Sequence, residues 1–464
     1  MYLNEFSIQR IKCFHDVTLK LPEKDGDHSG WNVILGGNGT GKSTLLQAMA
    51  IALTGPLVGQ RLLFNPAGWT RKEQKWGEFS ARISPGLNDS AIGQPRKKPY
   101  VAKFALTGNE AVEVEDETYD QPQIVQLKSD RKGLSTGPYA ASRPGWLACG
   151  YGPFRRLTGM GGSEEYDLVY APGRGKRFAT LFREGAAITN GTEWLVSLYT
   201  RSIDPHEADQ EKIANDLHLL QKVINNLLPG GVTLARVDAK NVYFQTIGGV
   251  SVTVPELSDG YRSFLALAID LLRHIHDAAN DFSAIVQCDG EIPRITMDGV
   301  VLIDEVDAHL HPRWQRQIGF RLCQAFPKLQ FIVTSHSPFV AQAANDHGLF
   351  VMRQPKGYGF VEAIQPVRSV RGWRVDQVLT DRMLFDLEGT RDEQTEQLME
   401  QHRQLAAKRE WGQLTAQERD GLIRLEQELS DVLTAPGETV ESREREQSMQ
   451  RYVNETLAEL KGHP

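Results

Sequence analysis

One stretch of eight residues limits what this 464-residue chain can fold into more than any other. It reads Gly36-Gly-Asn-Gly-Thr-Gly-Lys-Ser43 and fits the pattern GxxxxGK followed by Ser or Thr. The apolar run Trp31–Leu35 before it predicts a buried strand, and the apolar positions up to Leu53 after it predict a helix. A strand, a glycine-rich turn and a helix N-terminus in this order point several backbone N–H groups at one phosphate. We therefore expect a phosphate-binding loop rather than an ordinary glycine-rich turn.

Two side chains of this loop have the chemistry that a triphosphate and its metal ion require. The Lys42 ammonium is long enough to reach the outer phosphates, and the Ser43 hydroxyl is suited to bind Mg²⁺. The other loop residues expected to line the nucleotide are Gly36, Asn38, Gly39, Thr40, Gly41 and Thr44.

A second motif is a buried strand that ends in two carboxylates. Val300–Ile303 is wholly apolar and mostly β-branched, which predicts a strand buried on both faces. Asp304 and Glu305 then fall at its carboxyl end, where α/β sheets bind ligands. We expect Asp304 to hold Mg²⁺ through water and Glu305 to polarise the water that attacks the γ-phosphate. Two surface acids that cap a helix are the alternative, which the phosphate loop makes less favoured.

A third strand, Leu329–Ser335, ends in His336. The separation of 32 residues from Asp304 (336 − 304) is a normal span for one helix and one strand of an α/β sheet. A neutral histidine at that place is able to contact the γ-phosphate and to respond to its loss. A purely structural histidine at a strand end is the alternative.

The segment Leu257–Ser263 precedes a strongly apolar helix. Taken alone, Ser258 or Asp259 would be the helix N-cap, and Gly260 would ease the turn. Its place 46 residues before Asp304 (304 − 258) gives it a second meaning beside the other motifs.

Together, the four motifs resemble those of an ABC-type ATPase of the group that contains RecF, SMC and OLD proteins. Gly36–Ser43 resembles the Walker A loop, and Val300–Glu305 resembles Walker B with the catalytic glutamate. Ser258 and Gly260 stand at the two key places of the ABC signature. The fold that the resemblance implies is α/β, a P-loop ATPase head of the RecF/SMC type with a helical lid insertion and a helical C-terminal region.

The resemblance extends to two further positions. Asp307 stands where the family has its D-loop, and His336 where it has its switch histidine. The run Asp307–Pro312 is more typical of RecF and OLD proteins than of transporters. Asp259 and Tyr261 depart from the common signature, which has glycine and glutamine there. The implied cofactors are ATP and Mg²⁺, and the implied catalytic residues are Lys42, Glu305 and His336.

The family implies a mechanism that needs two copies of the chain. Two heads enclose two ATP molecules, and the Walker loops of one copy face the Ser258–Gly260 signature of the other. ATP then holds a homodimer together and hydrolysis loosens it. We expect such a homodimer, or a higher oligomer built from it. A scaffold that binds ATP but barely hydrolyses it is the alternative.

The spacing of the motifs divides the chain into four expected parts. About 215 residues separate the phosphate loop from the signature (257 − 42), too few for the long coiled-coil arms of SMC proteins. We expect the first half of the head over residues 1–145, with Walker A and a β-subdomain, and a helical lid over 146–250. The second half of the head then spans 251–369, and a helical accessory or partner-docking region spans 370–464.

Looser features narrow the resemblance to stand-alone ATPases of anti-phage systems, such as the Septu-type, retron-associated and PARIS-type ATPases. These features are Gly150–Arg155, Arg177–Phe182 and a predicted helix at Gln377–Phe385. Such ATPases are encoded beside a separate nuclease, so the resemblance implies a regulator of an effector of that kind. A RecF-like DNA-repair ATPase that binds DNA directly is the alternative. The arginines that end Tyr151–Arg156 fit either a solvated turn or a contact with nucleotide or DNA.

Charge and cysteine content set limits on partners and location. With 52 basic and 59 acidic residues, the net charge of −7 argues against a strongly basic polyanion binder. The local clusters Arg96–Lys98 and Lys128–Lys132 would be able to touch DNA, but such runs are more often solvated faces. Four widely spaced cysteines and the lack of any apolar run of about 18 residues predict a cytoplasmic protein with no membrane span, and the resemblance to anti-phage ATPases implies a bacterial one.

Overall fold

The computed structural model describes residues 1–433 apart from 25, 64, 90–97, 141–145, 156–173, 184, 187, 189–190, 291, 356, 367–368 and 388–389. The chain divides into two compact units, Met1–Asp386 and Leu387–Pro464. Arg156, most of the Arg96–Lys98 cluster and the last part of the expected C-terminal region lie outside the described residues.

The centre of the first unit, in its described part, is a six-stranded sheet of order β18-β17-β3-β16-β15-β9. Its strands are β3 (Gly30–Gly36), β9 (Leu147–Tyr151), β15 (Gly299–Ile303), β16 (Leu329–Ser335), β17 (Leu349–Arg353) and β18 (Glu362–Ile364). Neighbouring strands are parallel except where β18 pairs with β17 at the edge. Val301 and Ile303 belong to one hydrophobic core and Val300 and Leu302 to the other. Burial on both faces is the reason that this strand is apolar throughout.

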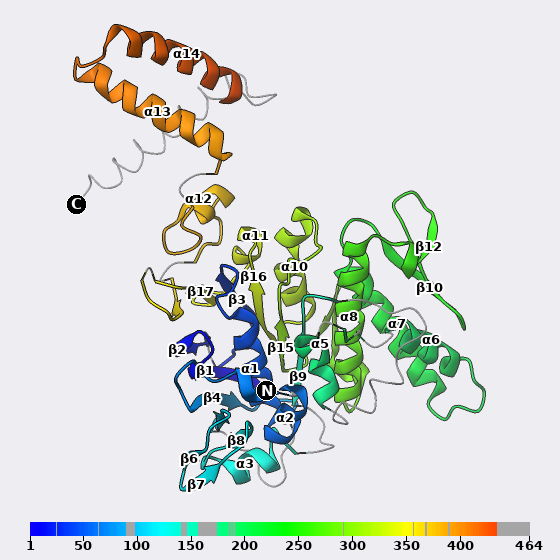
Figure 1. The fold of residues 1–464 in the computed structure, drawn as a ribbon. Coiled ribbons are helices and arrows are strands. Elements are labelled where there is room, and N and C mark those ends of the chain that lie inside the picture. The colour runs from blue at the N-terminus through cyan, green and yellow to red at the C-terminus, as the bar shows by residue number, and fades with distance from the viewer. Residues whose placement is uncertain are drawn as a thin grey trace, which may run out of the picture. The chain divides into compact units, whose positions relative to one another are not determined.

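An antiparallel sheet of order β2-β1-β4-β5-β8 packs on one side of the central sheet. Its strands are β1 (Tyr2–Ile11), β2 (Phe14–Lys20), β4 (Trp76–Ser84), β5 (Tyr100–Thr107) and β8 (Ile124–Gln126). Helix α1 (Lys42–Thr54) is buried along nearly its whole length, because it shares one core with strands of both sheets. A ribbon of β6 (Val112–Val114) and β7 (Glu117–Tyr119) and helices α2 (Pro56–Leu63) and α3 (Arg131–Thr136) complete this side (Figure 1).

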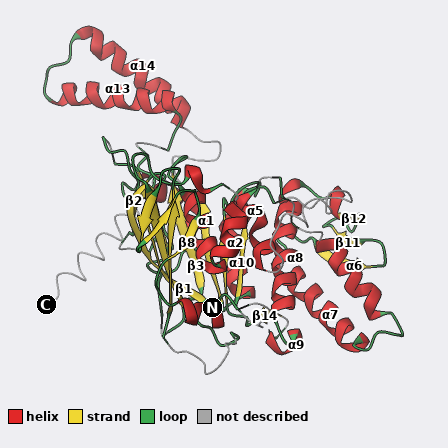
Figure 2. Ribbon diagram, turned by 60° about the horizontal axis from the view of Figure 1, so that its bottom comes forward, coloured by secondary structure: helices red, strands yellow, loops and turns green. Residues whose placement is uncertain are grey.

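Helices cover the other face of the central sheet. They are α6 (Gly191–Ser202), α7 (Gln210–Leu227), α8 (Asp259–Ala278) and α10 (Pro312–Ala325). Helices α6, α7 and α8 lie side by side, as the two ribbon views show (Figures 1 and 2). Smaller elements on this side are α9 (Phe282–Ile285), α11 (Pro338–Ala341), α12 (Val375–Thr380), β10 (Thr233–Val237), β11 (Val242–Gln245), β12 (Ser251–Thr253), β13 (Val286–Asp289) and β14 (Ile292–Ile295). Helix α5 (Ala179–Phe182) packs instead into the core on the side of α1. The architecture is thus the expected α/β head with helical additions.

Two segments lie elsewhere than the four-part division placed them. Leu147–Tyr151, within the range expected to be a lid, is strand β9 and pairs in parallel with β15. Residues 370–386, grouped with the C-terminal helices, belong to the first unit. A five-residue apolar run has too few residues to display a period, so sequence pattern did not distinguish this strand from a helix.

The described part of the second unit is a helical hairpin of α13 (Glu393–Glu410) and α14 (Ala416–Leu433). Lys408 pairs with Glu418 near the turn, and His402 lies beside Glu426 further away, so the helices run antiparallel. Leu422 and Leu429 of α14 are buried. Across the described residues of the whole chain, we find no helix with the length and apolar character that a bilayer span requires.

Candidate nucleotide-binding site

Three motif-bearing segments reach the same edge of the central sheet. The strand register pairs Ile303 with Val333, and Ser335 with Leu35, so β15, β16 and β3 end at almost one level. Because these strands are parallel, the segments that follow them leave the sheet on the same side. The phosphate loop, Asp304 with Glu305, and His336 therefore stand at one edge.

The phosphate loop joins the end of β3 to the first turn of α1. Gly39 and Gly41 have φ angles of 78° and 82°, a left-handed conformation that glycine adopts without strain. A Cβ atom on Gly41 would lie 2.5 Å from Cys13 Sγ, so the loop passes closely over the β1–β2 turn. The Thr40 hydroxyl donates to the Gly37 carbonyl over 2.9 Å and tightens the loop. Asn38 and Ser43 are exposed on its outer side.

The Lys42 ammonium lies over this loop. It donates to the carbonyl oxygens of Gly36 and Gly37, both at 2.9 Å. Burial lowers the pKa of Lys42, and the nearby carboxylates of Asp304, Glu305 and Asp307 act against that shift. The fold thus gathers the loop lysine and three acids that are more than 260 residues away in the sequence (304 − 42).

The residues at this edge fit a triphosphate with Mg²⁺. Two of the loop glycines leave no room for a side chain, since a Cβ on Gly36 would lie 2.7 Å from the Met352 carbonyl and one on Gly41 2.5 Å from Cys13 Sγ. One carboxylate oxygen of Asp307, Oδ1, is buried without a hydrogen-bond partner among the described residues. Hydroxyl and carboxylate oxygens, as in Ser43 and Asp304, are the ligands that Mg²⁺ prefers.

Asp304 and Glu305 are held by the neighbouring strand. The Thr334 hydroxyl donates to Asp304 Oδ1 and accepts the backbone N–H of Glu305 over 2.7 Å. Glu305 itself has φ 45°, a left-handed conformation that costs a residue with a side chain about 1–3 kcal/mol. A strained residue persists only when its surroundings fix it, so the contacts around Glu305 define where its carboxylate points.

Arg155, which sequence reasoning assigned to either solvent or ligand, is instead buried beneath these acids. Its side chain is 5 % exposed. One amino group donates to the Asp304 carbonyl over 3.0 Å and the other to the Glu305 carbonyl over 3.0 Å, with longer contacts to Gly152 and Val306. Burial lowers the pKa of Arg155 to about 10, against the opposing effect of Asp304, Asp307 and Glu305.

His336 follows β16 and is half-buried. The next residue, Ser337, caps α11 through its hydroxyl, which accepts the Phe339 N–H over 3.2 Å. The same hydroxyl donates to Gln315 Oε1 over 2.8 Å, and the Gln315 amide in turn donates to the Leu310 carbonyl. These bonds connect the histidine segment to the stretch after Asp307.

The signature segment begins α8. Ser258 is the N-cap residue by its backbone, yet no hydrogen bond from its side chain to the described helix is present, and it is exposed. Gly260 sits tightly against the stretch after Asp307, since a Cβ there would lie 2.9 Å from the His309 carbonyl. Asp259 pairs with Arg262 on the exposed side of the helix. The charges that act on Lys42 come from Asp304, Glu305 and Asp307, with no contribution from this segment.

Two family models match separate parts of the chain. Residues 5–135 match the family model described as "AAA domain", and residues 190–341 match the one described as "AAA domain, putative AbiEii toxin, Type IV TA system". A "Septu protein PtuA" of Bacillus mycoides is 27% identical over 391 residues, which cover 83% of this chain and 45% of that protein. A "Retron Ec83 probable ATPase" of Escherichia coli is 33% identical over 147 residues, which cover 30% of this chain and 26% of that protein.

These similarities agree with the predicted resemblance to ATPases of the SMC, RecF and OLD group. The resemblance to Septu and retron ATPases is thereby confirmed at the level of sequence. This chain spans less than half of the length of these curated relatives. A solved structure entitled "Crystal structure of the SmcHead bound to the C-winged helix domain of ScpA" aligns with a TM-score of 0.46 and 13% identity, over 79% of this chain and 98% of that one.

The sequence motifs did not single out one residue that lies near the phosphate loop. Lys12, in the β1–β2 turn, donates to the Thr44 hydroxyl over 3.3 Å, and its ammonium lies 4.6 Å from the centre of the Trp69 ring. Burial lowers the pKa of Lys12. The sequence does show a lysine in the short turn between two predicted strands, but nothing in the sequence placed that turn beside Thr44.

The second basic cluster, Lys128–Lys132, forms hydrogen bonds with nearby parts of the chain. Lys128 donates to Asp116 and to the Glu115 carbonyl over 3.3 Å each. Arg131 donates to the carbonyls of Leu127 and Gln126, which lie just before it in the chain. The described part of this cluster therefore agrees better with a solvated face than with a DNA contact.

Proposed function

We propose that this ATPase is an ATP-controlled dimerisation switch that regulates a separate nuclease or similar effector in an anti-phage defence system. One observation carries the proposal. Lys42, three carboxylates and His336 stand at one sheet edge, whereas the Ser258 hydroxyl at the start of α8 is exposed and uncommitted within the described residues. A second copy of the chain would bring its signature to that edge and complete the site.

The residues at the edge would divide the hydrolysis of ATP to ADP and phosphate among them. Lys42 would turn from the loop carbonyls to the outer phosphates and neutralise part of their charge. Ser43 and Asp304 would hold Mg²⁺, which supplies further neutralisation of the phosphate oxygens when bound. Glu305 would take a proton from the attacking water, and His336 would contact the γ-phosphate and respond to its release.

Asp307 is the residue best placed to connect hydrolysis to dimerisation. Its buried Oδ1 has no hydrogen-bond partner among the described residues and could accept a donor. The stretch that follows Asp307 packs against Gly260 through the His309 carbonyl. A change at the γ-phosphate would thereby reach the signature of the same chain. The proposed switch operates in the bacterial cytoplasm, where ATP is available and cysteines stay reduced.

The defence role is supported by similarity to proteins named as Septu and retron components. The test is to co-express the chain with its neighbouring reading frame and to measure assembly mass and ATP turnover with and without ATP. We expect a complex, and we expect Glu305→Gln to keep ATP and the dimer while turnover falls about 100-fold or more.

Two results would overturn this proposal in different ways. Equal turnover in wild type and Glu305→Gln would favour a scaffold that hardly hydrolyses ATP. A lone dimer with DNA-stimulated turnover and no partner would favour a RecF-like ATPase that acts on DNA directly.

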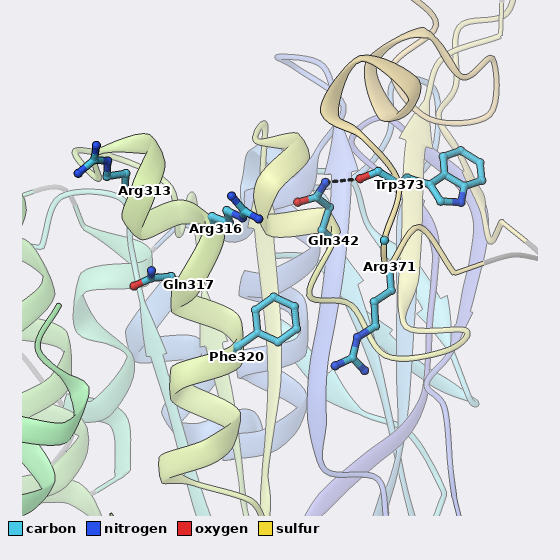
Figure 3. A pocket seen from close by; sticks show the side chains of 8 residues that line it. Arg313, Arg316, Gln317, Phe320, Gln342, Arg371 and Trp373 are labelled. Atoms are coloured by element: carbon cyan, nitrogen blue, oxygen red, sulfur yellow. Dashed lines mark hydrogen bonds between the residues drawn. The ribbon is translucent and has the colours of Figure 1, made fainter. Parts of the chain in front are cut away.

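A specific observation favours direct nucleic-acid binding as the second candidate function. Arg313, Arg316, Gln317 and Phe320 are spaced by three or four residues and therefore share one face of α10. They line a cavity of about 700 Å³ together with Gln342, Arg371, Gly372 and Trp373. Figure 3 shows Phe320 and Arg371 reaching toward one another, and the Arg371 guanidinium lies 5.5 Å from the Phe320 ring centre.

This arginine groove has the chemistry of a single-strand binding site. The residues that line it include three arginines and no carboxylate. Guanidinium groups bind phosphates in pairs of hydrogen bonds, and an exposed aromatic ring stacks on any base. A second cavity of about 1160 Å³ shares Phe320 and Arg371, but its lining also includes Glu23, Asp27 and Asp346, so the part without carboxylates is the first cavity.

The groove is tested with fluorescein-labelled single-stranded DNA of about 15 nucleotides, a length in the range that single-strand sites occupy. We expect Arg316→Glu with Arg371→Glu to weaken binding at least about tenfold and to lower its salt dependence, because phosphate contacts are lost. Lys103→Glu, on the exposed side of β5, is the control for charge alone. Equal binding by all three proteins, or preference for poly-glutamate over DNA, would contradict this candidate.

A further inference from the structure

We infer that Arg155 is a positioning residue for ATP hydrolysis: it fixes the backbone of Asp304–Val306 and so aims the Glu305 carboxylate. This rests on the proposed function, since it concerns the same reaction. Arg155 itself touches backbone carbonyls and not, in the described contacts, any group that would meet the nucleotide.

The backbone carbonyls of Asp304–Val306 need hydrogen-bond donors. After Ile303 the chain leaves the sheet, so the carbonyls that follow lose the ladder partners that β-strands provide. Buried carbonyls without a donor cost about 1–3 kcal/mol each. Arg155 donates to the carbonyls of Asp304 and Val306, and it gives a second donor to the Glu305 carbonyl, which also accepts the Ala308 N–H over 2.9 Å.

The backbone of Glu305 is held at both its N–H and its carbonyl. Thr334 accepts its N–H over 2.7 Å, and Arg155 donates to its carbonyl over 3.0 Å. With φ at 45°, Glu305 has a conformation that it would leave if one of these contacts were removed. Relaxation of this residue would swing the carboxylate away from the attacking water without changing the phosphate loop.

The planar guanidinium of Arg155, with its five donors, cannot be replaced by another cation. A lysine ammonium has three donors on a flexible stem and cannot span the row of carbonyls. Arg155→Lys would keep the buried charge but lose part of the geometry. The loop before Arg155 is also fixed to the same stretch, since Asp304 N–H donates to the Tyr151 carbonyl over 2.8 Å.

The chain offers a matched control. Arg321 likewise donates to two backbone carbonyls, those of Asn226 and Leu228, over 3.1 and 3.2 Å. These carbonyls lie at the C-terminal end of α7, on the helical side of the unit. Arg321→Met therefore removes the same kind of contact without touching Glu305.

The experiment compares wild type, Arg155→Lys, Arg155→Met and Arg321→Met in the full chain. It measures ATP affinity, turnover per folded molecule, melting temperature, and hydrogen exchange of residues 300–310. We expect both Arg155 variants to bind ATP within about threefold of wild type, while turnover falls about 100-fold in Arg155→Met and less in Arg155→Lys. Exchange should rise at Glu305 and Val306 in these variants, whereas Arg321→Met should change only the melting temperature.

Each outcome decides the matter. Unchanged turnover and unchanged exchange at Glu305 in Arg155→Met would overturn the inference, as would an equal loss of turnover in Arg321→Met. If the wild type itself fails to hydrolyse ATP, the proposed function fails, and hydrogen exchange still judges Arg155 separately. In that case, unaltered protection of Glu305 and Val306 would overturn the positioning role too.

Discussion

The two halves of the nucleotide site are built in opposite ways. The half with Lys42 and Glu305 stands on central parallel strands, and its polar groups are bonded to one another and to Thr334 and Arg155. The half with Ser258 and Gly260 starts a helix, exposes its hydroxyl and contacts the rest of the site through one tight approach to the His309 carbonyl. If the proposed function holds, the difference teaches that one chain prearranges the chemistry and presents its signature to another copy.

The largest effect is expected from the prearranged half. Lys42→Ala should lower ATP affinity about 100-fold, because hydrogen bonds to charged groups are each worth about 1.5–3 kcal/mol. Titration calorimetry with ATP and Mg²⁺ measures this. Lys103→Ala, an exposed lysine of β5, should bind like wild type. Unaltered affinity in Lys42→Ala would remove the phosphate loop from the proposed site.

A change in the signature half, at Ser258, should affect turnover rather than ATP affinity. Ser258→Arg should leave ATP affinity nearly unchanged but abolish turnover, because the altered signature would no longer complete the site of the other copy. Mixing it with Glu305→Gln should restore about a quarter of wild-type turnover, since half of randomly paired dimers would contain one intact composite site of two. Mixing that restores nothing would show that both halves act within one chain.

Within the prearranged half, two glycines separate strain from crowding. Gly39 and Gly41 share a left-handed φ, but a Cβ on Gly39 meets nothing within 4 Å, whereas one on Gly41 would lie 2.5 Å from Cys13 Sγ. Gly39→Ala should destabilise the chain by about 1 kcal/mol through strain alone. Gly41→Ala should cost more and weaken ATP binding as well. Melting temperature and ATP affinity, measured together, would contradict this if the two variants behaved alike.

The smallest effect on nucleotide chemistry is expected from the second unit. Leu422→Asp places a carboxylate at a position that is 3 % exposed and should unfold the hairpin of α13 and α14. ATP turnover of the first unit should stay within about twofold of wild type, because domains with separate cores fold as separate units. Circular dichroism and turnover test this, with the exposed Arg424→Asp as control. A loss of turnover in Leu422→Asp alone would make the hairpin part of the switch.

The sequence predicted those parts of the fold that a local pattern encodes. The strands at Trp31–Leu35, Val300–Ile303 and Leu329–Ser335 all lie in the central sheet, because residues buried on two faces must be apolar without a break. The helix after the phosphate loop ends at Thr54, just before the glycine and proline that signalled its end. The site residues chosen by motif stay predictions, although the structure brings the phosphate loop and the carboxylates together.

The sequence could not predict contacts made by one side chain to distant backbone. Arg155 showed only a glycine-proline turn around it, which fits solvent as well as a ligand. Lys12 and Thr44 are brought together by a strand turn that no local pattern locates. Strand β9 was too short for a period to reveal it, so its place beside β15 was equally hidden.

What the sequence determined by itself is the order of strand, phosphate loop, signature and acidic strand end, and with it the resemblance to one kind of ATPase. Short-range rules are enough for this, because glycine, lysine and apolar runs act on their neighbours in the chain. The tertiary structure alone decided that Thr334 and Arg155 would hold Glu305 between them, from about 30 and 150 residues away (334 − 305 and 305 − 155). Such pairs depend on where buried carbonyls lack donors, and that is known only once the sheet has formed.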